Sequence, residues 1–151
     1  MKEALDKAKE ELKRADHLIY VSLKYTRTCD VLKSVVERLI NAIDFMIESM
    51  LKKAREEKNV SDIPSQPRAK CLLLADKTGH PELKEMCNFY LLLRNIDQSK
   101  FTREREYRRH VAMIVQVEGK KLEVDIDAVN DYYKKAKRYY EIIEKMIYGN
   151  E

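Results

Sequence analysis

The segment "TREREYRRHV", residues 102–111, gathers arginine, glutamate, tyrosine and histidine side chains in one short stretch. If this segment is helical, successive side chains turn by about 100°, so Arg103 and His110 lie almost in line on one face. Tyr107 lies between them, and Glu106 is one turn from each. Arg105 is five positions before His110 and lies farther around the helix. The segment therefore predicts a small site along one helical face.

These residue types suit chemistry at a phosphodiester. The imidazole of His110 can transfer a proton near neutral pH. The guanidinium of Arg103 or Arg105 can hold a phosphate through two parallel hydrogen bonds. With Glu106 and Tyr107 as supporting groups, such a set would cleave RNA without a metal or another cofactor, because the 2′-OH of the RNA serves as the nucleophile.

The neighbouring charges allow a second interpretation of the same segment. Arg108 and Arg109 point elsewhere on such a helix, where we expect them to contact nucleic acid. However, Glu104 with Arg108 and Glu106 with His110 are also spaced as i, i+4 ion pairs, each worth only about 0.3–0.5 kcal/mol on an exposed helix. The segment is then a solvated face without a catalytic role, and the residue types alone leave both interpretations open.

The segment resembles the R-x4-6-H motif of the HEPN superfamily (higher eukaryote and prokaryote nucleotide-binding domains). Arg103 with six residues before His110 and Arg105 with four residues before it both match this motif. The opening "ALDKAKEELKRAD", at residues 4–16, and the position of the motif ahead of a final helix are also similar to this superfamily. Glu104 or Glu106 follows the candidate arginine, where the family often has Asn, Asp or His.

The resemblance implies an all-α bundle, and many members of the superfamily are metal-independent ribonucleases and toxins. In active relatives the motifs of two subunits face each other, which implies a homodimer here. Many other members have lost catalysis, so the resemblance leaves open whether this chain cleaves RNA or only binds it.

The composition supports a single helical domain over residues 1–151. Charged residues make up 37% of the chain and apolar residues 44%, with only three glycines and three prolines, which is typical of a helical protein. The net charge of +4 permits an anionic partner without demanding one. The apolar runs are far shorter than the roughly 20 residues that span a membrane, so we expect no membrane segment.

The N-terminus and the cysteines predict a cytoplasmic protein without a disulfide framework. Residues 1–16 carry scattered charges and no apolar secretory core. Cys29, Cys71 and Cys87 are odd in number and lack C-x-x-C spacing, so we expect buried thiols and not a structural zinc site.

Apolar spacing predicts long helices in the first half of the chain. A 3-4 repeat begins at Leu5 and predicts a helix that reaches about Lys24. The stretch "YTRTCD", residues 25–30, interrupts it, and Thr28 or Asp30 is positioned to cap the next helix. That helix carries two adjacent apolar stripes over residues 32–51, which predicts a central helix buried on more than one side.

Proline and glycine positions divide the middle of the chain. The stretch "VSDIPSQP", residues 60–67, predicts a loop. A short helix is expected over residues 68–76, with Gly79 as its C-terminal cap. Pro81 is then expected as the first residue of a helix that ends between residues 95 and 99.

Residues 111–126 follow the alternation of a β-strand instead of a helical period. With Gly119 and Lys120 as a type II′ turn, the two halves form a hairpin whose apolar side chains share one face. The expected pairs are Val117 with Leu122, Val115 with Val124, Met113 with Ile126, and Glu118 with Lys121.

The last helix is expected to begin after Asp125 or Asp127 and to end at Gly149. It carries five tyrosines, which suit a half-buried seam between helices or a surface that binds another subunit or protein.

The sequence therefore predicts a mainly α protein, an antiparallel bundle of four to five helices with a β-hairpin inserted before the last helix. The function it favours is RNA binding, with metal-independent cleavage left open. The alternative is a non-catalytic dimeric helical module whose last helix and hairpin dock a partner protein.

Overall fold

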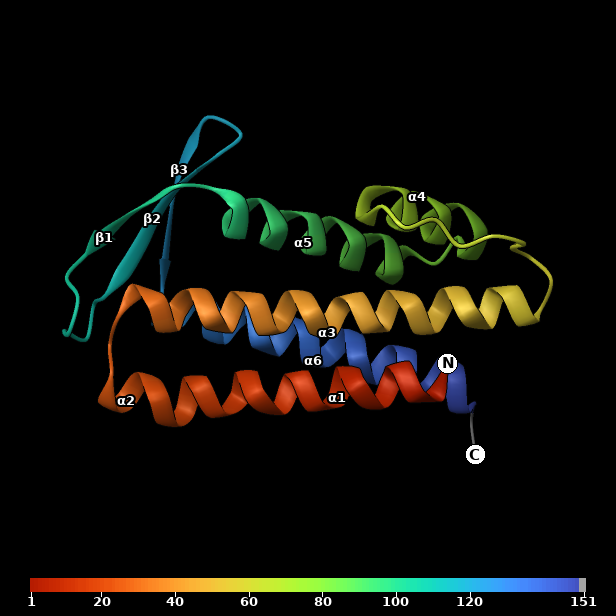
Figure 1. Cartoon of the computed structure of the whole chain (residues 1–151), viewed down its shortest axis with the longest axis horizontal. Helices are drawn as coiled ribbons and strands as arrows, with labels where there is room; N and C mark the ends of the chain where they lie inside the picture. The colour runs from red at the N-terminus through yellow and green to blue at the C-terminus, as the bar shows by residue number, and fades with distance from the viewer. Residues whose placement is uncertain (150–151) are drawn as a thin grey trace.

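The computed structural model describes residues 1–149 and shows a bundle of long helices with a small sheet at one end (Figure 1). The helices α1 and α5 run in one direction, and α3 and α6 run in the other. In chain order the elements are α1 (Lys2–His17), η1 (Leu18–Ser22), α2 (Leu23–Tyr25), α3 (Cys29–Glu56), α4 (Pro67–Thr78), α5 (Pro81–Gln98), β1 (Phe101–Glu104), β2 (Ala112–Val117), β3 (Lys120–Asp125) and α6 (Ile126–Tyr148). The prediction of a mainly α bundle with a β insert before the last helix is confirmed.

The first helix is continuous from α1 through α2, as the apolar spacing predicted. Its only irregularity is the π-helical turn η1, which lies one turn before the helix ends. Ile19 within this turn and Leu23 after it are both buried. The next helix is capped by Thr28, whose hydroxyl accepts a hydrogen bond from the backbone N–H of Val31 at 3.3 Å. Of the two predicted caps, Thr28 is therefore the one used.

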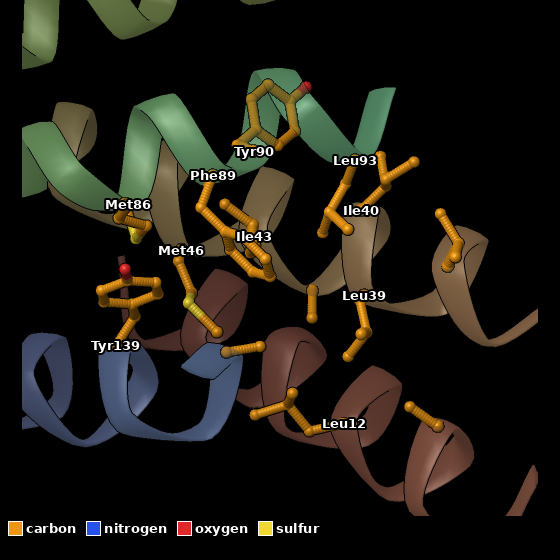
Figure 2. Packing of buried hydrophobic residues seen from close by; sticks show 14 of the residues in the cluster. Leu12, Leu39, Ile40, Ile43, Met46, Met86, Phe89, Tyr90, Leu93 and Tyr139 are labelled. Atoms are coloured by element: carbon orange, nitrogen blue, oxygen red, sulfur yellow. The ribbon is translucent and has the colours of Figure 1, made fainter. Parts of the chain in front are cut away.

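The central helix is α3, which packs against α1, α5 and α6. Both of its predicted apolar stripes are buried: Leu32, Val35, Leu39, Ala42 and Met46 in one, and Val36, Ile40, Ile43, Ile47 and Leu51 in the other. Figure 2 shows Met46 beside the Tyr139 ring of α6 and Met86 of α5. The predicted burial on several sides is confirmed, because three helices share this one partner.

Gly79 and Pro81 mark the end of α4 and the start of α5 as predicted, whereas α4 begins at Pro67, one residue before its predicted start. Pro67 is the first residue of α4, and Gly79 ends this helix with a φ of 60°, in the left-handed region that glycine adopts without strain. Pro81 begins α5, and the side chain of His80 accepts a hydrogen bond from the backbone N–H of Glu82. Cys71 and Cys87 are free and buried where these two helices pack together.

The predicted two-stranded hairpin is part of a three-stranded antiparallel sheet. β1 pairs with one side of β2, and β3 pairs with its other side. Met113 and Val115 of β2 are fully buried beneath the sheet, where β2 packs against α3 and α5. The prediction missed β1 because it treated the arginine-rich residues that follow Phe101 as helical.

The register of the hairpin differs from the prediction by two residues. Val115 lies opposite Leu122, Met113 opposite Val124, and Lys121 opposite Gln116 instead of Glu118. The turn consists of Glu118 and Gly119, both with positive φ, at 53° and 77°. These positive φ values at both central residues are those of a type I′ turn, which replaces the predicted type II′ turn at Gly119 and Lys120.

The last helix, α6, begins with the cap that one of the two expected aspartates provides. The Asp125 carboxylate accepts a hydrogen bond from the backbone N–H of Ala128 at 2.8 Å. Gly149 follows the end of the helix, as predicted. Tyr139 and Tyr140 are buried against the bundle, and Tyr132 and Tyr133 pack partly buried against the same core.

Within residues 1–149, no helix combines the length and the apolar character needed to cross a membrane.

Candidate functional site

The predicted helical line of site residues does not form. Arg103 lies in β1, opposite Met113, and the chain then leaves the strand through a loop that returns to β2. Arg105 and Tyr107 in this loop have φ values of 51° and 67°, in the left-handed region that a right-handed helix excludes. The helical interpretation was wrong because pairing with β2 stabilises an extended chain here, and these two backbone conformations then turn it back.

Arg103 is occupied by acidic partners. Its guanidinium lies 2.9 Å from the Asp30 carboxylate and 3.5 Å from that of Glu106. The hydrogen bond to Asp30 also raises the pKa of Arg103 above its ordinary value. The structure therefore does not bring Arg103 to His110 as a free phosphate clamp; it uses this guanidinium to join β1 to the start of α3.

Arg105 holds the loop closed. Its Nε donates a hydrogen bond to the backbone carbonyl of His110 at 2.8 Å, and its guanidinium forms an ion pair with Glu123 of β3. Arg105 thus contacts the backbone of the predicted catalytic histidine and fixes where that residue leaves the loop.

Glu106 and Tyr107 tie the loop to the turn between α2 and α3. The Glu106 carboxylate accepts a hydrogen bond from the backbone N–H of Cys29, the first residue of α3, at 3.1 Å. The backbone N–H of Tyr107 donates to the carbonyl of Arg27 at 2.6 Å. In Figure 1 the connection from β1 to β2 accordingly lies at the same end of the bundle as α2 and the start of α3. The contacts of Glu106 and Tyr107 therefore hold the loop against the turn between α2 and α3.

Beside this anchored loop lies a pocket of about 370 Å³. It is bounded by the end of the first helix, by the last residues of the loop and by the start of α6. Its apolar lining comes from Ile19, Leu23 and Ile126, and its polar lining from Tyr20, Lys24, Arg27, Arg109, His110, Asp125, Asp127 and Asn130. Of the predicted site residues, His110 and Arg109 are the two that reach this pocket.

The basic side chains of the pocket are not neutralised by neighbours. Among the ion pairs formed within residues 1–149, none includes Lys24, Arg27 or Arg109. Arg103 and Arg105, in contrast, both have acidic partners. The positive charge available to a ligand thus comes from a different set of residues than the motif indicated.

Exposed tyrosines surround the same end of the bundle. The exposed fractions of Tyr20, Tyr25 and Tyr107 are 52%, 85% and 77%. Tyr20 lines the pocket, Tyr25 follows Lys24 in α2, and the backbone of Tyr107 is bonded to that of Arg27. Sequence reasoning missed this contribution of the first helix and the turn after it, although "YVSLKYTR", residues 20–27, combines two tyrosines with two basic residues and could have indicated it.

No group of three or more His, Cys, Asp or Glu side chains within the described part of the chain is arranged to hold a metal ion. The thiol of Cys29 is buried and lies 3.2 Å from the carbonyl oxygen of Ala112, and this burial raises its pKa. The polar groups that line the pocket are cations, an imidazole, carboxylates, an amide and a phenol.

No family model, curated protein or solved structure matches this chain. The resemblance to the HEPN superfamily stays a prediction based on the residues quoted above.

Proposed function

We propose that the chain binds single-stranded RNA at this pocket. The observation that carries the proposal is the set of three cations, Lys24, Arg27 and Arg109, that share one pocket with His110 and have no acidic partner within residues 1–149. Cations that are free of ion pairs can neutralise phosphates and release the counterions bound to them. Tyr20 at the pocket, and the exposed Tyr25 and Tyr107 at the same end of the bundle, supply flat surfaces on which unpaired bases stack.

The arginines in this proposal differ from those of the motif. Arg103 and Arg105 remain bound to Asp30, Glu106 and Glu123, and they position the loop. Arg27 and Arg109 take over the contacts to phosphate. If bound RNA is cleaved, His110 is the residue suited to move the proton of the 2′-OH, since an imidazole exchanges protons near neutral pH.

Two observations weaken the alternative of a docking module built on the last helix. Tyr139 and Tyr140 are buried in the bundle, and Tyr132 and Tyr133 are partly buried against it, so α6 does not offer a tyrosine stripe to a partner. The homodimer implied by the family resemblance is a separate expectation, which light scattering of the purified chain tests.

The proposal is tested with fluorescently labelled single-stranded RNA in EDTA. We expect saturable binding. The logarithm of the binding constant should fall with the logarithm of the salt concentration at a slope of about −2, because each of three phosphate contacts contributes about 0.7. Binding that does not respond to salt would exclude phosphate recognition, and absence of binding at low salt would refute the proposal.

The same samples test for cleavage. His110→Ala is the informative variant, because His110 is exposed and its side chain forms no hydrogen bond or ion pair within the described residues. Products formed by the wild type and not by His110→Ala would identify an endoribonuclease. Intact RNA with both proteins, together with normal binding, would identify a non-cleaving RNA-binding protein.

A further inference from the structure

The pocket is divided into a basic side and an acceptor side. Lys24 in α2, Arg27 in the turn that follows it and Arg109 in the loop supply the cations. The start of α6 supplies Asp127 and Asn130 on the other side, next to the capping residue Asp125. No ion pair within residues 1–149 joins the two sides. A ligand that fills the pocket therefore meets both positive charge and hydrogen-bond acceptors.

Two further acceptors line the pocket at the start of α6. Asp125 is used by the fold, because one of its oxygens caps α6. Asp127 is exposed and forms no ion pair, and the Oδ1 atom of Asn130 is buried without a hydrogen-bond donor among the described residues. A buried acceptor without a donor is costly, so a ligand that donates a hydrogen bond here would be favoured.

The wall between the two sides is apolar. Ile19, Leu23 and Ile126 form it, and the half-exposed ring of Tyr20 lies at the same pocket. A flat heterocycle packs well against such a wall and against an aromatic ring. The volume of about 370 Å³ lies at the lower end of the roughly 300–1,000 Å³ usual for small-molecule sites, so one nucleotide is the expected occupant.

Among the nucleotides, the acceptors favour guanine. The guanine base presents two adjacent donors, its ring N1–H and its exocyclic amino group, which match a carboxylate through two parallel hydrogen bonds. Uracil presents a single N–H between two carbonyl oxygens, and those oxygens would face the acceptors of Asp127 and Asn130. A phosphate attached to the same nucleoside reaches back toward Arg27 and Arg109.

We propose that this pocket binds a guanosine nucleotide, with the guanine edge at Asp127 and Asn130 and the phosphate at the cations. This proposal rests on the proposed RNA binding and specifies the base that the pocket selects. The source of the nucleotide is either an RNA strand or a free guanosine monophosphate, and both present the same groups to the pocket.

The test compares a short labelled oligouridine with the same oligomer containing one central guanosine. We expect the guanosine-containing RNA to bind at least about tenfold more tightly, within the discrimination that one bidentate base contact provides. Asp127→Asn should remove most of this preference without weakening binding of the oligouridine. Asp131→Asn is the matched control, because Asp131 is an exposed acid of the same helix that does not line the pocket.

Competition with guanosine and uridine monophosphates separates the possible outcomes. Equal affinity for the two oligomers would overturn the guanine assignment and leave RNA binding in place. Binding of guanosine monophosphate without binding of either RNA would support the guanine pocket and refute the RNA proposal. A preference that Asp127→Asn and Asp131→Asn reduce equally would also overturn the assignment, because general electrostatics would then explain it.

Discussion

Replacing Glu106 with alanine tests how the loop that carries Arg109 and His110 is held in place. The Glu106 carboxylate is the partner of the first backbone N–H of α3, at 3.1 Å, and it lies 3.5 Å from the guanidinium of Arg103. Its side chain is 23% exposed, so water replaces these contacts only in part. Alanine would leave the N–H of Cys29 without this acceptor and would remove the side-chain contact between the loop and the start of α3.

The expected loss follows from these two contacts. A hydrogen bond to a charged group contributes about 1.5–3 kcal/mol, and partial exposure places this one near the lower value. The exposed pair with Arg103 adds about 0.5 kcal/mol. We therefore expect Glu106→Ala to reduce the free energy of unfolding by about 2 kcal/mol, which lowers Tm by about 4–8 °C in a protein of this size.

Glu104→Ala is the matched control, measured by the same thermal and denaturant unfolding. The Glu104 side chain is 46% exposed and lies 4.0 Å from Arg105, so its removal should change the free energy of unfolding by less than about 0.5 kcal/mol. Glu106→Gln, which keeps an acceptor oxygen but loses the charge, should fall between the two. If Glu106→Ala is as stable as Glu104→Ala, Glu106 does not anchor the loop.

Three further predictions concern the bundle and the sheet. Burial raises the pKa of several tyrosines above the ordinary value of about 10, so the folded chain keeps protons that the unfolded chain releases. The contribution of these tyrosines to stability is therefore constant below about pH 10 and is lost as the pH rises beyond it; the tyrosines concerned are Tyr90, Tyr132, Tyr133, Tyr139 and Tyr140. A denaturant midpoint that stays unchanged above about pH 10 would contradict this. Thr28→Ala should cost about 1 kcal/mol through loss of the α3 cap, and denaturant unfolding of this variant would show no change if the cap were unimportant. Gly119→Ala should cost about 1 kcal/mol and Glu118→Gly should be neutral or stabilising, because both positions have positive φ; thermal unfolding with the opposite order would exclude the type I′ turn.

The helices could be predicted from sequence because their apolar spacing is set by burial. In α3, for example, Leu39 and Ile43 belong to two adjacent stripes, and both are fully buried. Pro81 and Gly79 mark helix ends for reasons of backbone geometry that act within a few residues. These preferences act between residues close in the sequence, and the tertiary contacts of the folded chain do not override them.

The hairpin register could not be fixed in the same way. A slip of two residues keeps every side chain on the same face of the strand, so Met113 and Val115 point into the core in either register. The burial pattern is therefore identical for both, and only the turn decides between them. Glu118 in a left-handed conformation is an unusual choice that the sequence did not indicate.

The candidate site was predicted only in part because it is assembled from distant segments. His110 and Arg109 lie in the stretch that the motif singled out. Lys24 comes from α2, Arg27 from the turn that follows it and Asn130 from α6, and in the sequence they are ordinary polar residues at or near helix ends. Pairing of β1 with β2, which is a long-range interaction, also changed the role of Arg103 from a phosphate clamp to a structural ion pair.

Two adjacent arginines provide the most direct measurement of the central claim, that single-stranded RNA binds at the pocket. Arg109 lines the pocket and Arg108 does not, although both are exposed and each carries one positive charge. The measurement is the affinity of Arg109→Gln and of Arg108→Gln for labelled single-stranded RNA over a series of salt concentrations. We predict that Arg109→Gln weakens binding about tenfold and makes the salt slope shallower by about 0.7, the contribution of one phosphate contact, whereas Arg108→Gln changes both much less. Equal effects of the two substitutions, or no effect of either, would contradict the account.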